Sequence, residues 1–289
     1  MKKNIEKIVK RPAERGMVGD GFPVYHYFPG GPVSMHRMSP FLLLDYAAES
    51  NFAPSEYARG VGAHPHKGFE TVTIAIKGAV EHHDSAGNHG VIYPGDVQWM
   101  TAGSGLLHKE YHEKEFSRNG GSFEMIQLWV NLPARFKKEA PHYQSIKADQ
   151  IGVYELPDNG GTVKVIAGSW HDVQGPAKTY TPINLFQVDM NEGGIFNGTV
   201  EEGHTLSVLV MEGETTMQGK RIEPQSLVVF ETSGTVFSIR ADSKARLLFM
   251  SGEPLNEPIA SYGPFVMNTQ AELMETFEEF REGKFGELN

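Results

Sequence analysis

Cysteine is absent from the 289-residue chain. This absence excludes disulfide bonds, thiolate metal sites, a cysteine nucleophile and a thiol redox switch. Any transition-metal site in the chain must therefore be built from imidazole and carboxylate groups.

Long apolar runs and an excess of positive charge are also absent. No window of the sequence approaches the roughly 18 consecutive apolar residues of a membrane span. The 26 basic residues are outnumbered by 36 acidic residues, which gives a formal net charge of -10. An acidic protein repels phosphate backbones and anionic lipid, so neither nucleic acid nor a membrane is expected as a partner.

The remaining composition, with 39% hydrophobic and 21% charged residues, is typical of a globular protein. The first residues, MKKNIEKIVKRP, lack the apolar core of about 7 to 15 residues that marks a secretory signal. A cytoplasmic location is therefore expected.

Histidine, by contrast, is abundant and unevenly distributed. The chain has 12 histidines. Nine of them lie in the first 112 residues: His26, His36, His64, His66, His82, His83, His89, His108 and His112. Because cysteine is missing, these side chains are the first candidates for a metal site.

Short runs rich in Val, Ile, Phe and Thr dominate the chain and predict β-strands. Eight such runs cover residues 71–76, 124–132, 162–168, 185–190, 205–213, 226–232, 236–241 and 246–252. Turn sequences such as DSAGN and PDNGG separate them, and the gaps are too short for crossover helices. The pattern predicts an all-β protein made of antiparallel sandwiches or barrels.

One stretch, residues 268–280, has helical periodicity. We expect Asn268 to cap this short C-terminal helix, and Leu273, Met274, Phe277 and Phe280 to form its packing face, with the other domain as one possible partner.

The two halves of the chain contain a faint repeat. In each half a strand ends at a glycine, Gly78 or Gly213, and a turn with a proline, Pro94 or Pro224, leads into another apolar strand. The repeat predicts two tandem β domains, residues 1–140 and 141–289, with the boundary in the polar stretch 133–159.

Two residue pairs in the first half have the spacing of metal ligands on a strand. His64 and His66 are two residues apart, and so are His108 and Glu110. Residues two apart point to the same face of a strand, so each pair can converge on one ion. Together they make a set of three histidines and one carboxylate, which leaves one or two coordination positions for water, dioxygen or substrate.

The second half offers an internal control. We count the distance in sequence from each of the four residues to Gly78 or Pro94, and then count the same distance from Gly213 or Pro224. None of the positions reached in this way is a histidine. They are Thr199, Glu201, Ser238 and Arg240. The second domain is therefore predicted to lack this site.

Five sequence blocks together resemble the pirin family of proteins: HPHKGFETVT, PGDVQWMTAGSGLLHKE, IQLWVNL, GEPLNEP and GPFVMNT. The resemblance extends from about residue 16 to residue 280. It implies a bicupin, with two antiparallel β-barrel (jelly-roll) cupin domains and a single metal, usually iron, in the N-terminal one. The ligands of the family fall on His64, His66, His108 and Glu110.

The resemblance also implies a function. Pirin-like proteins are known as quercetin 2,3-dioxygenases in bacteria and as nuclear, iron-dependent transcription cofactors in animals. We expect a metal-dependent dioxygenase that acts on a flavonol or another small phenolic compound with O2, with Glu110 as the general base. The alternative is an iron-binding, redox-sensitive regulatory protein that acts through a protein partner without turnover. Fe(II) is the expected metal, and Mn, Ni, Cu, Co and Zn stay open because the same ligands suit them.

Other candidate residues have less specific interpretations. Glu70 stands where many cupins place a ligating glutamate, and we expect it to support a ligand or the structure instead of binding the metal. The hairpin after Gly78 carries His82, His83, Asp84 and His89, which could bind a metal, but its turn residues DSAGN favour a solvated loop. His112 could line the rim of the site, and an exposed strand end is the expectation for it. Gly103 to Gly105 predicts a tight turn. Four residues could line an apolar substrate cavity or fill a barrel core: Phe69, Trp99, Met125 and Trp129.

Overall fold

The computed structural model describes residues 1–288, which group into two compact units. The C-terminal unit comprises Met1–Ala13, Arg37–Pro40 and Asp149–Pro254, and the N-terminal unit comprises Glu14–His36, Phe41–Ala148 and the residues from Leu255 onward. Each unit is named after the half of the sequence that supplies most of its residues.

The compact units differ from the ranges 1–140 and 141–289 at the two chain ends. The first residues belong to the C-terminal unit because strand β1 (Ile5–Val9) pairs with β22 (Ser226–Phe230). The last residues belong to the N-terminal unit, where the backbone N–H of Val266 donates to the carbonyl of Lys67 over 3.0 Å. Local sequence patterns do not reveal such pairings, because the partners lie some 200 residues apart in the chain.

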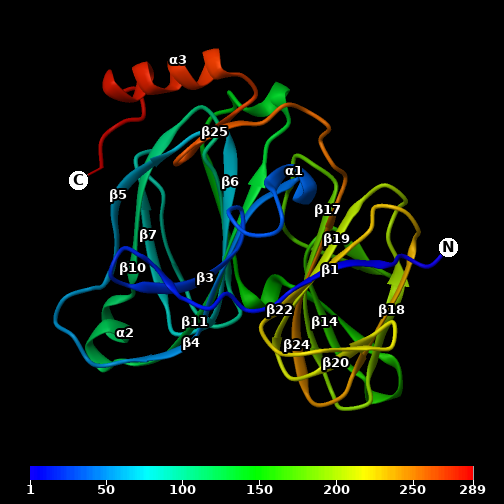
Figure 1. The fold of residues 1–289 in the computed structure, drawn as a ribbon. Helices are drawn as coiled ribbons and strands as arrows, with labels where there is room; N and C mark the ends of the chain where they lie inside the picture. The colour runs from blue at the N-terminus through cyan, green and yellow to red at the C-terminus, as the bar shows by residue number, and fades with distance from the viewer. Residues whose placement is uncertain (289) are drawn as a thin grey trace. The chain divides into compact units, whose positions relative to one another are not determined.

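The N-terminal unit contains a seven-stranded and a four-stranded antiparallel sheet (Figure 1). The larger sheet has the order β12 (His142–Ile146), β9 (Val97–Thr101), β6 (Phe69–Lys77), β11 (Gly121–Asn131), β4 (Phe41–Phe52), β3 (Phe22–Phe28) and β2 (Gly16–Val18). The smaller sheet has the order β5 (Gly60–His66), β10 (Leu106–His112), β7 (Val80–Asp84) and β8 (His89–Ile92). A two-stranded ribbon, β25 (Ala260–Tyr262) and β26 (Phe265–Met267), completes the unit.

The C-terminal unit repeats this arrangement. Its seven-stranded sheet has the order β1, β22, β19 (Thr205–Glu212), β24 (Ala245–Gly252), β17 (Ile183–Met190), β14 (Gly161–Ala167) and β13 (Gly152–Leu156). Its four-stranded sheet has the order β18 (Ile195–Thr199), β23 (Val236–Ala241), β20 (Thr215–Met217) and β21 (Lys220–Ile222). The short strands β15 (Ser169–Trp170) and β16 (Val173–Gln174) pair with each other.

These sheets confirm the predicted all-β fold and its internal repeat. All eight predicted runs form strands, which are β6, β11, β14, β17, β19, β22, β23 and β24. Each unit has two sheets in the jelly-roll manner instead of a single closed ladder. By position in the sheet order, β5 and β10 of the N-terminal unit correspond to β18 and β23 of the C-terminal unit.

The interior of the C-terminal unit is filled by apolar side chains. Phe186 and Phe249 from its large sheet pack with Phe196, Phe237 and Ile239 from its small sheet. The corresponding small sheet of the N-terminal unit instead buries His66, His82 and His108. The two units therefore share a fold, and their small sheets bury different side chains, histidines in the N-terminal unit and apolar residues in the C-terminal unit.

The C-terminal helix α3 (Gln270–Arg281) forms close to its predicted position and packs on the β25–β26 ribbon (Figure 1). The prediction that Asn268 caps this helix is wrong by one residue. Thr269 caps the helix, because its hydroxyl accepts from the backbone N–H of Glu272 while the Glu272 carboxylate accepts from the backbone N–H of Thr269. Leu273 is buried, whereas Met274 of the predicted packing face is 58% exposed.

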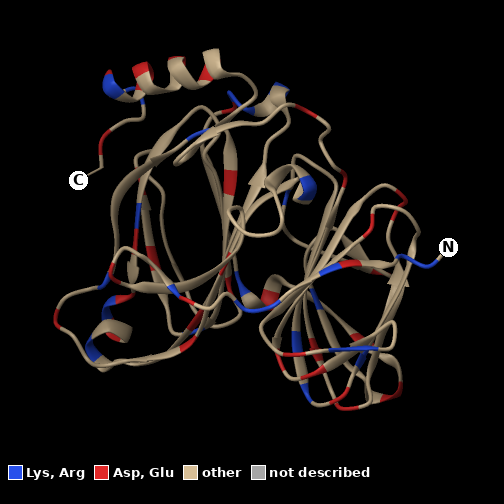
Figure 2. Ribbon diagram, in the orientation of Figure 1, with Lys and Arg blue, Asp and Glu red and all other residues tan. Residues whose placement is uncertain are grey.

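The other helical segments are short. They are α1 (Met35–Met38), α2 (Lys114–Asn119) and the 3-10 turns Ala134–Phe136, Ala148–Gln150 and Pro157–Asn159. Within residues 1–288, every helix is too short or too polar to cross a bilayer. Figure 2 shows basic and acidic residues interspersed along the strands and loops of both units.

Candidate metal centre

The two predicted ligand pairs lie on neighbouring strands. Antiparallel pairing of β5 with β10 places His108 opposite His64, and a bulge follows between His108 and Glu110. Burial alternates along β10, so that His108 and Glu110 are buried while Lys109 between them is less so. Strand periodicity thus directs both members of this pair into the unit, as the spacing predicts.

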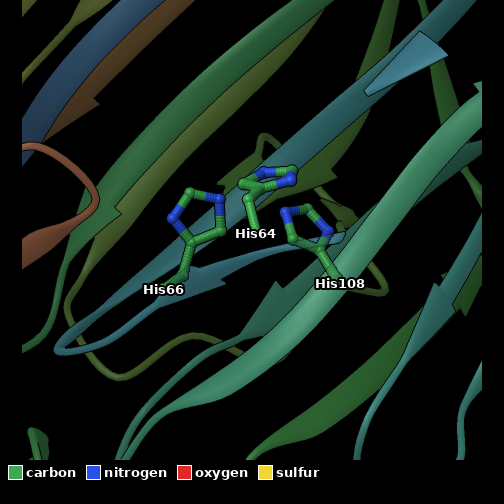
Figure 3. Close-up of side chains that lie close together, drawn as sticks. All are labelled: His64, His66 and His108. Carbon is green, nitrogen blue, oxygen red and sulfur yellow. The ribbon is translucent and has the colours of Figure 1, made fainter. Parts of the chain in front are cut away.

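Three imidazole rings meet at this position (Figure 3). The candidate ligand atoms of His64, His66 and His108 lie within 4.8 Å of one another. Their ring centroids are 4.2 to 4.8 Å apart. Residues far apart in sequence therefore present their ring nitrogens to one common point.

The ring nitrogens at this point have the character of metal ligands. Nε2 of His108 and Nδ1 of His66 are buried, and neither has a hydrogen-bond partner among the described residues. Burial, together with the neighbouring rings, holds the pKa of both imidazoles well below the usual range, so they stay neutral. An unsatisfied buried polar atom costs about 1–3 kcal/mol, and a divalent ion would satisfy both nitrogens at once. The residues present therefore fit a transition metal.

Glu110 is held beside the three rings by a hydrogen-bonded chain. Its Oε1 accepts from the side-chain amide of Gln98 over 2.7 Å, and the hydroxyl of Tyr143 donates to the amide oxygen of Gln98 over 3.1 Å. Candidate ligand atoms of Glu110, His82 and His108 form a second group within 4.8 Å of one another. The carboxylate predicted as fourth ligand thus groups with His108 and with His82, which was not predicted there, while His64 and His66 group with His108 alone.

The prediction of a solvated loop is wrong for His82 and Asp84. Strand β7 extends to Asp84, so the turn begins later than expected, and Val80, His82 and Asp84 alternate into the interior. The alternation of these three residues was the signal in the sequence. His83 and His89, whose side chains are 37% and 55% exposed, do remain accessible to solvent.

His82 connects the centre to a buried carboxylate. Nε2 of His82 lies 3.2 Å from Oδ2 of Asp84, and Nδ1 of His82 lies 3.4 Å from Nδ1 of His108. Burial alone would raise the pKa of Asp84, but hydrogen bonds from His82 and Asn88 outweigh it and lower that pKa. With Asp84 ionised, His82 donates through Nε2 and accepts through Nδ1, and His108 donates through Nδ1. This assignment leaves the lone pair of His108 Nε2 free for a metal.

Two further predictions concern Glu70 and His112. Glu70 is buried on β6, accepts from the hydroxyl of Thr101 over 2.7 Å, and lies outside the convergent groups found in residues 1–288. Burial raises its pKa to about 7. The exposed position predicted for His112 is wrong, because the alternation of β10 continues and His112 packs against Phe52 and Phe123. It is a core histidine, and burial lowers its pKa to about 4.

A cavity of about 460 Å³ adjoins the centre. It is lined by Val18, Phe22, Val24, His26, Leu43, Asp45, Val61, His64, His66, Glu110, Met125, Gln127, Trp129 and Pro264. Small-molecule sites typically measure about 300–1,000 Å³ and have mostly apolar walls with a few polar groups. Four residues were predicted either to line a substrate cavity or to fill the barrel core. Met125 and Trp129 line this cavity, whereas Phe69 and Trp99 are fully buried.

A polar pair in the cavity wall was not predicted. Nδ1 of His26 lies 2.6 Å from Oδ1 of Asp45. The hydrogen bond to Asp45 raises the pKa of His26, and burial raises the pKa of Asp45 against the opposing effect of His26. The strands that carry the two residues pair antiparallel at this position, and nothing in the local sequence signals that contact.

The C-terminal unit has no counterpart of this centre within the described part of the chain, where every convergent group lies in residues 64–110. Thr199 and Ser238, reached by the sequence offsets, are exposed on β18 and β23. The inward positions of these strands are occupied by Phe196, Phe237 and Ile239. The positions reached by the sequence offsets are thus one residue out of register with the inward-facing positions of these strands.

Fold and centre together define a two-domain cupin protein whose N-terminal unit carries a cluster of metal-ligand type. The pirin family model matches residues 21–130, and the model described as the pirin C-terminal cupin domain matches residues 185–286. The chain belongs to the pirin family.

Relatives of the chain include bacterial proteins of similar length. A Pseudomonas aeruginosa protein named "Putative quercetin 2,3-dioxygenase" is 45% identical over 273 residues, which cover 94% of this chain and 95% of the relative. A "Pirin-like protein" of Caulobacter vibrioides is 39% identical, over 88% of this chain and 90% of the relative. The crystal structure titled quercetin 2,3-dioxygenase from Acinetobacter baumannii is 45% identical and covers 100% of both chains with a TM-score of 0.95.

Proposed function

We propose that this pirin-family protein is a metal-dependent dioxygenase that cleaves flavonols such as quercetin with O2. The observation that carries the proposal is the convergence of three histidines beside an apolar cavity large enough for a small molecule. The names of relatives at 45% identity support the same reaction class.

We propose that His64, His66, His108 and Glu110 hold one divalent metal ion. Fe(II) is our choice, and Mn, Ni, Cu, Co and Zn are the alternatives with the same ligand preference. When bound, such an ion supplies Lewis-acid and template chemistry toward the substrate hydroxyl and O2. The protein supplies neutral imidazoles for it, because burial lowers the pKa of His66 and His108.

Glu110 is proposed as the general base. It lines the cavity, where a substrate hydroxyl can approach it, and Gln98 holds one of its two carboxylate oxygens. If it loosened from the metal that it is also proposed to bind, this carboxylate could accept the hydroxyl proton while Gln98 keeps it beside the substrate. The neighbouring amide and hydroxyl groups therefore position the base.

The rest of the cavity suits a flat, weakly acidic ring compound. Phe22, Met125 and Trp129 offer apolar surface for the rings. His26, whose pKa is raised by the hydrogen bond to Asp45, offers a proton to an anionic oxygen of the ligand. The proposed substrate class, a flavonol or similar phenolic compound, has both features.

The test is oxygen uptake by the iron-loaded protein with quercetin. We expect uptake by the wild type, and its loss together with most of the bound iron in His66→Ala. His36→Ala, which changes an exposed histidine outside the centre, is the matched control and should retain both. Iron binding without any uptake across a panel of phenolic compounds would overturn the proposed activity and would favour a regulatory role through a protein partner.

A further inference from the structure

A second histidine cluster lies on the hairpin of β7 and β8, outside the proposed centre. His83 on β7 pairs directly with His89 on β8. Glu81 is two residues before His83, so its side chain lies on the same face of the sheet. The cluster thus combines a cross-strand pair with a neighbour on one strand.

The three side chains are already gathered around one point. Nε2 of His83 lies 2.9 Å, and Nε2 of His89 3.2 Å, from the same oxygen, Oε1 of Glu81. The two ring centroids are 4.3 Å apart, and the candidate ligand atoms lie within 4.8 Å of one another. Two imidazoles that direct the same nitrogen to one carboxylate oxygen need only small rotations to share an ion.

We propose that Glu81, His83 and His89 bind a second divalent transition-metal ion of the zinc, copper or nickel class. Two imidazoles and one carboxylate are ligands that these ions prefer, whereas Ca²⁺ and Mg²⁺ prefer oxygen ligands alone. To bind the ion through Nε2, each neutral imidazole takes the tautomer with its proton on Nδ1: the Nε2 proton is lost to solvent and Nδ1 gains one from it, so no net proton is released. The partial exposure of both histidines leaves room for water to complete the coordination.

This site is separate from the proposed centre because strand periodicity divides β7 between two faces. His82 and Asp84 point into the unit, while Glu81 and His83 point to the other side. Strand β8 is the edge of its four-stranded sheet, paired only with β7 in that sheet. An ion bound by His83 and His89 therefore links the edge strand β8 to β7.

The experiment counts metal in a protein whose proposed inner centre has been removed. In the untagged His64→Ala/His66→Ala/His108→Ala variant, which also breaks the group of His82, His108 and Glu110, isothermal titration with Zn²⁺ should still show about one equivalent bound. Adding His83→Ala and His89→Ala should abolish that binding. Adding His36→Ala and His204→Ala instead removes the same number of histidines from other places and should leave the binding unchanged.

A second measurement tests the location of the ion. Zn²⁺ should raise the melting temperature of the His64→Ala/His66→Ala/His108→Ala variant and should not raise it once His83 and His89 are also replaced. Circular dichroism establishes that each variant folds. The proposal is overturned if the His64→Ala/His66→Ala/His108→Ala variant binds no zinc, or if its zinc binding survives replacement of His83 and His89. The inference is independent of the proposed dioxygenase activity, because the inner centre is absent throughout the test.

Discussion

At the scale of single residues, hydrogen bonds decide which ring nitrogens are available. Nδ1 of His64 lies 2.9 Å from the carbonyl oxygen of Gly62, which leaves Nε2 of that ring free. The hydrogen bonds of His82 to Asp84 and to Nδ1 of His108 likewise leave Nε2 of His108 free. Groups that orient a metal ligand in this way fix its tautomer and raise its basicity.

His82→Ala should therefore weaken metal binding at the proposed centre by about 10–100-fold, although His82 is not a proposed ligand. The assay is iron competition with a chelator, carried out in a His83→Ala/His89→Ala background so that only the inner centre is counted. His36→Ala in the same background is the control. An unchanged affinity in His82→Ala would show that the hydrogen bond does not orient His108.

His26 and Asp45 predict a pH effect at the cavity. The pKa of His26 is raised by the hydrogen bond to Asp45, so its stabilising charge is fully present below the ordinary histidine pKa and is lost as the pH rises through the raised value. Flavonol binding should weaken over the same rise in pH. In Asp45→Asn the pKa of His26, followed by NMR titration of its ring protons, should fall toward the ordinary value. If it does not move, the hydrogen bond is not its cause.

At the scale of elements, the turn between β5 and β6 illustrates how distant segments hold the centre. Gly68 has a φ of 87°, and a Cβ there would lie 2.0 Å from the carbonyl oxygen of Val266. The buried amine of Lys137 donates to the carbonyls of Gly68 and Val266 and to the side chain of Asn131. One lysine thus connects the turn after the His66 strand with the C-terminal segment.

Lys137→Ala should lower the free energy of unfolding by about 3 kcal/mol, because three buried acceptors lose their donor. Chemical denaturation measures the change. Lys138→Ala is the neighbouring control, since Lys138 forms an exposed ion pair with Glu275 and its loss should cost less than about 1 kcal/mol. Equal effects of the two substitutions would contradict the proposed connecting role of Lys137.

At the scale of the whole molecule, one fold is used twice with different interiors. Each unit has a seven-stranded and a four-stranded sheet. Phenylalanines fill the inward positions of the small sheet in the C-terminal unit, whereas histidines and Glu110 occupy them in the N-terminal unit. Burial of apolar side chains stabilises the folded unit. Burial of polar side chains costs free energy, which a bound ligand can offset.

Phe237→Ala should therefore destabilise the protein by about 3–5 kcal/mol through a cavity in the C-terminal unit. Metal bound per folded molecule should stay the same, because the proposed ligands belong to the N-terminal unit. Calorimetry and metal analysis of the folded fraction measure the two quantities. A loss of metal from the folded protein would show that the two interiors are not independent.

The sequence by itself determined the strands, the repeat and the same-face spacing of the two pairs that are proposed as metal ligands. His64 with His66, and His108 with Glu110, could be recognised because alternation along a strand is a local property. For His83 and His89 the sequence offered metal binding only as the alternative to a solvated loop, and it gave no role to Glu81, because this cluster depends on which residues of two strands lie opposite each other.

Only the tertiary structure decided what surrounds those pairs. It placed His82 behind His108, brought His26 to Asp45, and paired β1 with β22. These contacts join strands through register, and register depends on turn lengths and on packing across the whole unit. Local periodicity predicts which face of a strand a side chain lies on, whereas its contacts depend on how the strands assemble into sheets.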